Sequence, residues 1–154
     1  MQPTCHFVRL MQNRSVSPGI VRSVRTNLLD IAYEESGPAD GRPVVLLHGF
    51  PDDVRAWDGV APPLASAGYR VIVPYLRGFG GTRFLDGRTP RVGQQAAIGL
   101  DVLELLDALG IAQGSLAGFD WGCRAACVAS IAAPDRVRAL LALGVTTSTM
   151  RCHV

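Results

Sequence analysis

Short apolar runs alternate with segments of helical spacing along most of this 154-residue chain. Runs of apolar and β-branched residues predict strands over residues 20–25, 28–35, 44–47, 69–73, 115–118 and 137–145. Spacing and composition predict helices over residues 57–67, 89–109 and 121–133. Strands that alternate with helices are typical of an α/β domain with a mostly parallel sheet, right-handed crossovers and helices on both faces.

Turn and cap residues divide these elements. Thr26-Asn27 joins the first two strands into a predicted antiparallel hairpin, and the unbroken apolar run at 44–47 is typical of a strand buried on both faces. Pro62-Pro63 marks a break or a helix start. Thr89-Pro90 matches an N-cap with proline at the first helical position, and Gly110 ends that helix.

Composition supports a folded core and disfavours two classes of partner. Apolar residues make up 48% of the chain and charged residues 18%, which excludes a wholly disordered protein. A net charge of +2 is too small a bias to predict nucleic-acid binding. The longest apolar run, around residues 140–145, is far short of the ~20 residues that a membrane span needs.

Neither the cysteines nor the N-terminal segment predicts a cofactor or an export signal. Cys5, Cys123, Cys127 and Cys152 form no C-x-x-C pair, and Cys123 and Cys127 share one helix face, where small apolar packing is the favoured interpretation over a metal or redox site. Residues 1–18 lack the continuous apolar region of a secretory signal, so we expect a flexible tail and, by default, a cytoplasmic protein. A transit peptide is the alternative, because this stretch is basic and free of acids.

The chemistry concentrates at Gly118-Phe119-Asp120-Trp121-Gly122, between a predicted strand and a predicted helix. A tight strand-to-helix turn forces its central residue into a strained conformation and raises its side chain clear of the sheet. Gly118 and Gly122 lack Cβ atoms, so strand and helix can approach closely. The helix N-terminus stabilises a carboxylate at position 120, as a nucleophile requires. The alternative is that Asp120 merely caps the helix.

A second motif, His48-Gly49-Phe50-Pro51, directly follows the buried run at 44–47. The carboxyl edge of an open α/β sheet is where ligands bind. Glycine lets the backbone turn, so the N–H groups of Phe50 and Trp121 would together bind a developing oxyanion. We expect His48 to brace this loop by hydrogen bonding rather than to act as a catalytic base.

The ordered set of motifs resembles the N-terminal half of an α/β-hydrolase, in the subgroup with an aspartate nucleophile. This subgroup contains soluble epoxide hydrolases and haloalkane dehalogenases. The resemblance covers about residues 20–147 and rests on HGFP at 48–51, Trp57, AGYRVIVPYLRGFGGT at 67–82, GFDWG at 118–122 and PDRV at 134–137. HGFP together with DWG is more similar to epoxide hydrolases. Fluoroacetate-type dehalogenases carry arginine where Trp121 stands, although Arg124 matches a second arginine of that group.

The resemblance implies that Asp120 attacks a substrate carbon and forms an alkyl-enzyme ester, which a histidine-activated water hydrolyses. Small apolar organic compounds would be the substrates, with no cofactor. In dehalogenases the indole of Trp121 would hold the halide; packing beside the turn is an equal alternative for this residue. Phe50, Trp57, Tyr75, Phe79 and Trp121 either line an apolar site or belong to the core.

The chain departs from the family at its end. The family's orienting acid and histidine lie beyond the strand at 137–145, and residues 146–154, which include His153, do not resemble it. We therefore expect a flexible tail at 1–18, a partial α/β-hydrolase domain at 19–147 and an irregular tail at 148–154, in a truncated protein that is inactive or nearly so alone. The unpaired edge and apolar surface favour self-association. A non-catalytic interaction module and, less favoured, a nucleotide-binding domain are the competing classes.

Overall fold

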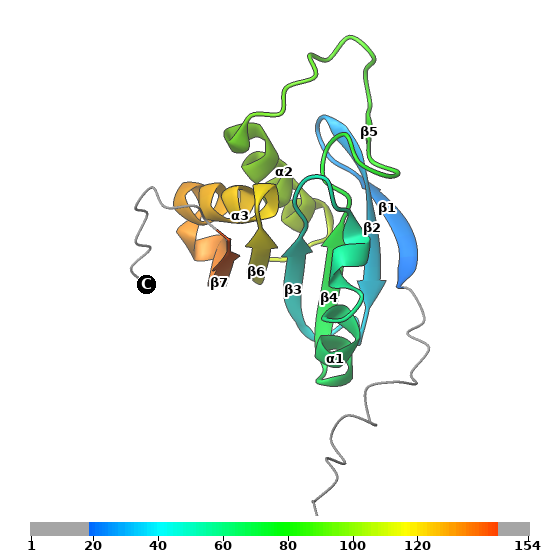
Figure 1. The fold of residues 1–154 in the computed structure, drawn as a ribbon, viewed down its shortest axis with the longest axis vertical. Helices are drawn as coiled ribbons and strands as arrows, with labels where there is room; N and C mark the ends of the chain where they lie inside the picture. The colour runs from blue at the N-terminus through cyan, green and yellow to red at the C-terminus, as the bar shows by residue number, and fades with distance from the viewer. Residues whose placement is uncertain (1–18, 145–154) are drawn as a thin grey trace, which may run out of the picture.

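The structure is a computed structural model that describes residues 19–144 (Figure 1). The strands are β1 (Ile20–Arg25), β2 (Leu29–Ser36), β3 (Arg42–Leu47), β4 (Tyr69–Pro74), β5 (Arg83–Phe84), β6 (Gly114–Phe119) and β7 (Val137–Leu143). The helices are α1 (Ala61–Ser66), α2 (Gln95–Ala108) and α3 (Trp121–Ala132), with short 3₁₀ turns η2 (Val54–Trp57) and η3 (Pro134–Arg136). The predicted tails at 1–18 and 148–154, and residue 145 at the end of the last predicted strand, lie outside the described residues.

The strands form one seven-stranded sheet in the order β1-β2-β4-β3-β6-β7, with β5 paired to β2. The central pairs β3–β4, β3–β6 and β6–β7 are parallel, whereas β2 pairs antiparallel with β1, β4 and β5. This topology confirms the predicted α/β class, with a mostly parallel sheet and an antiparallel N-terminal hairpin.

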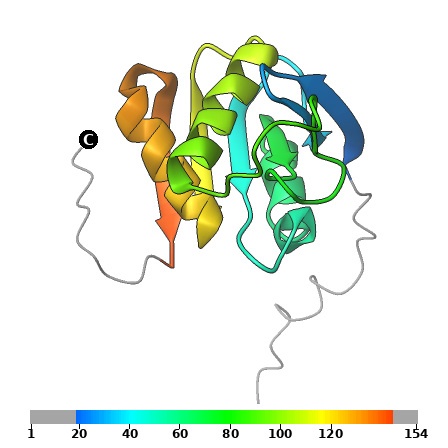
Figure 2. The ribbon, with the colours of Figure 1, turned by 90° about the horizontal axis from the view of Figure 1, so that it is seen from above.

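Helices cover both faces of the sheet, as predicted (Figure 2). Val45 and Leu47 of β3 belong to the core on the side of α2 and α3, and Val44 and Leu46 belong to the core beneath α1 and η2. Adjacent residues of a strand point to opposite faces, and both faces of β3 are covered, so all four side chains are buried. The unbroken apolar run at 44–47 therefore reflects burial on two sides.

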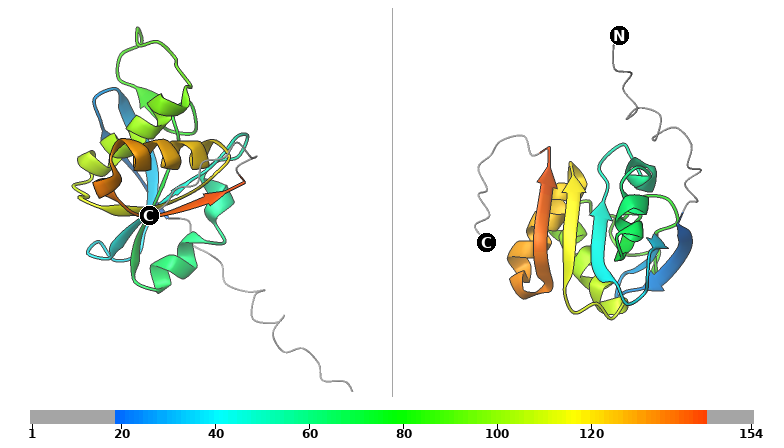
Figure 3. Two further views of the ribbon diagram at one scale, coloured as in Figure 1. Left: turned by 90° about the vertical axis from the view of Figure 1, so that its left-hand side faces the viewer. Right: turned by 90° about the horizontal axis from the view of Figure 1, so that it is seen from below.

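Cover is uneven across the sheet. In the right-hand view of Figure 3, α1 lies in front of the sheet near β3 and β4, whereas the front of β7 carries no helix from residues 19–144. Leu141 and Leu143 of β7 are 55% and 43% exposed. The expected exposed apolar surface is thus present at this edge.

Two predicted helices were wrong at their starts. The helix expected over 57–67 is found only as α1 at Ala61–Ser66, and Trp57 instead ends η2. Pro62 and Pro63 lie in the first turn of α1, which confirms that they mark a helix start, because residues without N–H groups suit that turn. The helix expected from Thr89 begins at Gln95. The Asp86 side chain accepts a hydrogen bond from the Arg88 N–H at 2.8 Å, a local turn that competes with helix formation just before Thr89. The two-residue strand β5 was not predicted.

Candidate active site

The carboxyl ends of β3 and β6 place two loops side by side. These strands are parallel neighbours, and Leu47 is in register with Gly118. The loop after β3 begins at His48, and the turn after β6 contains Asp120. Residues about 70 positions apart in the sequence therefore meet at one edge of the sheet, as the sequence motifs predicted.

Asp120 has an unusual backbone conformation, with φ 49° and ψ −118°. It is the only non-glycine residue with positive φ among residues 19–144. Its side chain makes no capping hydrogen bond to α3. Asp120 therefore occupies the N-cap position without capping α3 through its side chain, and its carboxylate is left available at the start of the helix.

Three glycines allow the close packing around this turn. A Cβ on Gly118 would lie 2.5 Å from the carbonyl carbon of Gly122, and a Cβ on Gly122 would overlap the carbonyl oxygen of Leu47. A Cβ on Gly49 would lie 2.6 Å from the Cβ of Asp120. Because nothing larger than hydrogen fits, glycine at these positions determines how closely the two loops approach.

The backbone N–H of Phe50 donates a hydrogen bond to Oδ2 of Asp120 at 3.2 Å. Phe50 is 68% exposed, and its backbone rather than its side chain makes this contact. Pro51 follows through a cis peptide bond. Trp121 is half-buried and packs against the core beside α2, and the Arg124 guanidinium lies 5.5 Å from the Trp121 ring centroid. An aromatic ring and a cation thus lie on the first turn of α3, directly after Asp120.

His48 is fully buried between the loops that follow β3 and β4. Its Nε2 atom accepts a hydrogen bond from the Leu76 N–H at 3.2 Å, which leaves the proton on Nδ1, 3.0 Å from the carbonyl oxygen of Gly49. Burial lowers the pKa of His48, and this favours the neutral ring. Both ring nitrogens form hydrogen bonds with backbone groups, so the imidazole links the loop after β3 to the loop after β4.

The predicted aromatic residues divide between core and surface. Trp57 is 5% exposed and lies 5.6 Å from the Phe119 ring, so it belongs to the core under η2. Phe79 contacts the edge of His48 at 4.7 Å between ring centroids. Tyr75 packs against the core of the α1 face and contacts Glu34. Among these residues, only Phe50 combines high exposure with a contact to Asp120.

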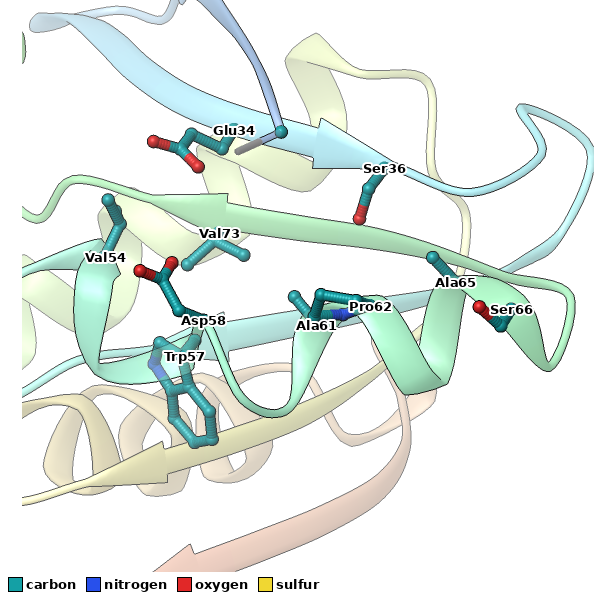
Figure 4. Close-up of a pocket in the computed structure, with 11 residues that line it drawn as sticks. Glu34, Ser36, Val54, Trp57, Asp58, Ala61, Pro62, Ala65, Ser66 and Val73 are labelled. Atoms are coloured by element: carbon teal, nitrogen blue, oxygen red, sulfur yellow. The ribbon is translucent and has the colours of Figure 1, made fainter. Parts of the chain in front are cut away.

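A separate cavity of about 200 Å³ lies between α1 and strands β2 and β4 (Figure 4). Figure 4 shows the carboxylates of Glu34 and Asp58 near one end, and Ser36 and Ser66 lie toward the other. Glu34 is already paired with Arg55. The cavity is not lined by Asp120, and it therefore does not provide a substrate pocket for that carboxylate.

Sequence reasoning missed a buried ion pair between Arg77 and Asp101. The guanidinium donates to both Asp101 oxygens at 2.6 Å, and the two side chains are 7% and 9% exposed. Asp101 lies on the buried face of α2 between Ile98 and Leu105. An acid at a core position of an amphipathic helix was the available signal, because buried carboxylates require a partner.

Comparisons with known proteins cover most of the chain. A family model described as "alpha/beta hydrolase fold" matches residues 42–153. "Epoxide hydrolase 2" of Siraitia grosvenorii is 41% identical over 117 residues, which are 76% of this chain and 35% of that protein. A solved candidate epoxide hydrolase of Klebsiella pneumoniae has 52% identity and a TM-score of 0.77, covering 78% of this chain and 40% of its own.

A haloalkane dehalogenase of Mycobacterium marinum is 48% identical over 60 residues, which are 39% of this chain and 20% of that protein. The chain spans 35% and 40% of the lengths of the two epoxide hydrolase relatives named above. Within residues 19–144, no helix is long and apolar enough to cross a membrane.

Proposed function

Because the chain belongs to the α/β hydrolase fold family, we propose that Asp120 is the nucleophile of an epoxide-hydrolase-like reaction. The observation that carries the proposal is the geometry of Asp120. Its carboxylate makes no capping hydrogen bond to α3, and its backbone is held at φ 49°. The Phe50 N–H donates a hydrogen bond to one of the two carboxylate oxygens. The other oxygen is available to attack a substrate carbon.

In the first step, Asp120 Oδ1 attacks a carbon of the epoxide ring. A new C–O bond forms to the carboxylate, the ring C–O bond breaks, and the released oxygen takes a proton from solvent water to become a hydroxyl, leaving hydroxide in the solvent. The product is a hydroxyalkyl ester of Asp120. The Phe50 N–H holds the carboxylate oxygen that does not attack, and this fixes the direction of the attacking one.

In the second step, water adds to the carbonyl carbon of the ester, and negative charge develops on its oxygen. We assign the stabilisation of this charge to the N–H groups of Phe50 and Trp121. Collapse of the intermediate releases the diol and restores the carboxylate. His48 is the only histidine among residues 19–144, and its engaged nitrogens disqualify it as the base for this water. The described part of the chain therefore carries the first step better than the second.

The remaining site residues have supporting functions. His48 holds the loop that presents the Phe50 N–H, Gly49 allows that loop to pass beside Asp120, and Pro51 follows Phe50 through a cis peptide bond. Gly118 and Gly122 bring β6 and α3 together at the turn. The exposed Phe50 ring and the half-buried Trp121 ring favour a small apolar organic substrate.

A haloalkane or haloacetate dehalogenase is the second candidate. It is favoured by the similarity to the Mycobacterium marinum dehalogenase and by the Trp121 indole and Arg124 guanidinium on the first turn of α3. An indole N–H and a cation are both suited to a leaving halide. The two candidates share the nucleophile and differ in the leaving group.

Mass spectrometry of the intact 154-residue chain separates these candidates. After incubation with an aryl epoxide, we expect an adduct of the full mass of the epoxide, up to one per chain. A haloalkane adduct would add only the alkyl group. Asp120→Asn should abolish the adduct, whereas Asp40→Asn, at an exposed turn remote in the sequence, should leave it unchanged. An adduct that persists in Asp120→Asn would overturn the proposal.

We also propose that copies of this chain associate through the β7 edge. The edge strand exposes Leu141 and Leu143, and its outer backbone groups have no strand partner within the described sheet. Unpaired apolar edges of this kind pair readily with other chains. No nucleic-acid partner is proposed, since the net charge is only +2.

A further inference from the structure

We propose that the buried Arg77–Asp101 ion pair positions the loop after β3, residues 48–51, which presents the Phe50 N–H, and that it acts through Leu76 and His48. This inference rests on the proposed function of Asp120 and adds two residues to it. Neither Arg77 nor Asp101 contacts Asp120 directly. Their effect on the site passes from α2 to the Phe50 N–H through a series of hydrogen bonds that are joined by the peptide links Leu76–Arg77 and Gly49–Phe50.

The proposal begins from what holds Phe50 in place. This residue is 68% exposed and contributes little packing, yet its N–H must point at the Asp120 carboxylate. The carbonyl of the preceding residue, Gly49, accepts a hydrogen bond from His48 Nδ1 at 3.0 Å. The Gly49–Phe50 peptide unit is therefore fixed on one side by the imidazole and on the other by Asp120.

The imidazole is itself held by the loop after β4. The Leu76 N–H donates to His48 Nε2 at 3.2 Å, and the Phe79 ring contacts the imidazole edge. A shift of the Leu76 backbone would move the imidazole and also remove the bond that keeps the proton on Nδ1. The orientation of the Gly49 carbonyl thus depends on the position of Leu76.

Arg77, the next residue, fixes that position. Its guanidinium donates to both oxygens of Asp101 at 2.6 Å, to the Val92 carbonyl at 2.8 Å and to the Ala97 carbonyl at 3.2 Å. These contacts attach the loop after β4 to α2 and to the segment that precedes it. Because both charged side chains are less than a tenth exposed, removing one leaves the other buried without its partner.

A second arginine–carboxylate pair, which is partly buried, provides the control. Arg70 donates to Glu35 at 2.7 Å, with side chains 18% and 14% exposed, and Glu35 also pairs with Arg22. This cluster joins β4 to β2 and β1 and makes no hydrogen bond to His48. Asp101→Asn and Glu35→Gln each remove one carboxylate that is paired with an arginine, the first on α2 and the second on β2. Only Asp101→Asn disturbs the proposed series of contacts.

The experiment measures the His48 ring and the chemistry of Asp120 separately. In chain labelled with ¹⁵N-histidine, the His48 signals are identified by their loss in His48→Asn. We expect Asp101→Asn to speed exchange of the Nδ1 proton with water at least tenfold and to slow ester formation with an aryl epoxide at least tenfold. Glu35→Gln should leave both rates within twofold of wild type.

Equal effects of the two variants on both rates, or an unchanged Nδ1 exchange rate in Asp101→Asn, would overturn the proposal. If Asp101→Asn does not fold, Arg77→Lys keeps the charge but loses the fork of donors, and the same comparison applies. If the wild-type chain forms no ester, the proposed function fails while the exchange comparison still decides whether Arg77 and Asp101 position His48.

Discussion

Asp120 holds a conformation that glycine adopts more easily than aspartate. Residues forced into sparsely populated backbone regions cost about 1–3 kcal/mol each, and they cluster at functional sites. The close approach of Gly118, Gly122 and Gly49 to their neighbours leaves the turn little freedom to relax. We infer that the strained turn lowers the free energy of unfolding and that, in return, it exposes the Asp120 carboxylate.

This strain predicts that glycine is more stabilising than alanine at position 120, the reverse of their usual order in a helix. At ordinary helix positions glycine is about 1 kcal/mol less stabilising than alanine. At position 120 we expect Asp120→Gly to be more stable than Asp120→Ala by about 1–2 kcal/mol, because only glycine tolerates φ 49° without strain. Urea unfolding of the two variants measures the difference. Equal stability, or a more stable alanine variant, would show that the turn is not strained.

His48 gives a prediction about pH. Burial lowers its pKa, so the unfolded chain takes up a proton at higher pH than the folded chain does. The free energy of unfolding should therefore fall as pH drops below about 6.5, by up to about 1.4 kcal/mol per pH unit. Comparing urea unfolding of wild type and His48→Asn between pH 7.5 and 5.5 isolates this slope, because the carboxylates are common to both. If the free energy of unfolding of wild type and of His48→Asn has the same dependence on pH, burial does not lower the pKa of His48.

At the scale of elements, the junction between β6 and α3 depends on the absence of a side chain at Gly122. A Cβ there would overlap the Leu47 carbonyl oxygen of β3. We expect Gly122→Ala to destabilise the chain by about 1–3 kcal/mol or more, the usual cost of overpacking. Gly87→Ala is the control, since nothing lies within 4 Å of its Cβ position. Thermal unfolding midpoints of the two variants test the expectation, which similar losses in both would contradict.

The exposed leucines of β7 lead to the prediction for self-association. Leu141→Lys should shift the chain toward monomer in analytical ultracentrifugation, because a charged edge resists pairing. Leu100→Lys is the matched control: Leu100 lies on α2 and is 52% exposed, against 55% for Leu141. If both substitutions change association equally, general hydrophobicity rather than the β7 edge is responsible.

The sequence predicted strands and turns correctly where a local pattern of apolar residues or glycines is compatible with only one kind of element. The buried run at 44–47 and the glycine-flanked turn at 118–122 both predicted the observed structure, because their patterns follow from packing on two faces and from close backbone approach. Helix starts were less predictable. Pro90 satisfies the local rules for a first helical residue, but the Asp86–Arg88 turn and the Arg77 bond to Val92 hold that segment in another conformation. Such contacts depend on residues that meet only in the folded chain.

At the scale of the whole molecule, the sheet brings together the residues proposed for the first step of the reaction. The parallel order β3-β6 places the Phe50 N–H beside Asp120, and α2 braces the loops through Arg77 and Asp101. The chain spans 35% of the Siraitia grosvenorii epoxide hydrolase that it resembles. Sequence motifs pointed to the proposed nucleophile and to the loop opposite it, whereas the ion pair behind that loop became visible only in three dimensions.

The most direct test of the central claim is a peptide map of the 154-residue chain after reaction with an aryl epoxide. Trypsin cleaves after Arg91 and Arg124, so Asp120 lies in the peptide 92–124 together with Asp101, Glu104, Asp107 and Cys123. We predict a single ester on Asp120, located by fragment ions and removed by hydroxylamine. Modification of another carboxylate, a hydroxylamine-stable adduct on Cys123, or no adduct in this peptide would contradict the account.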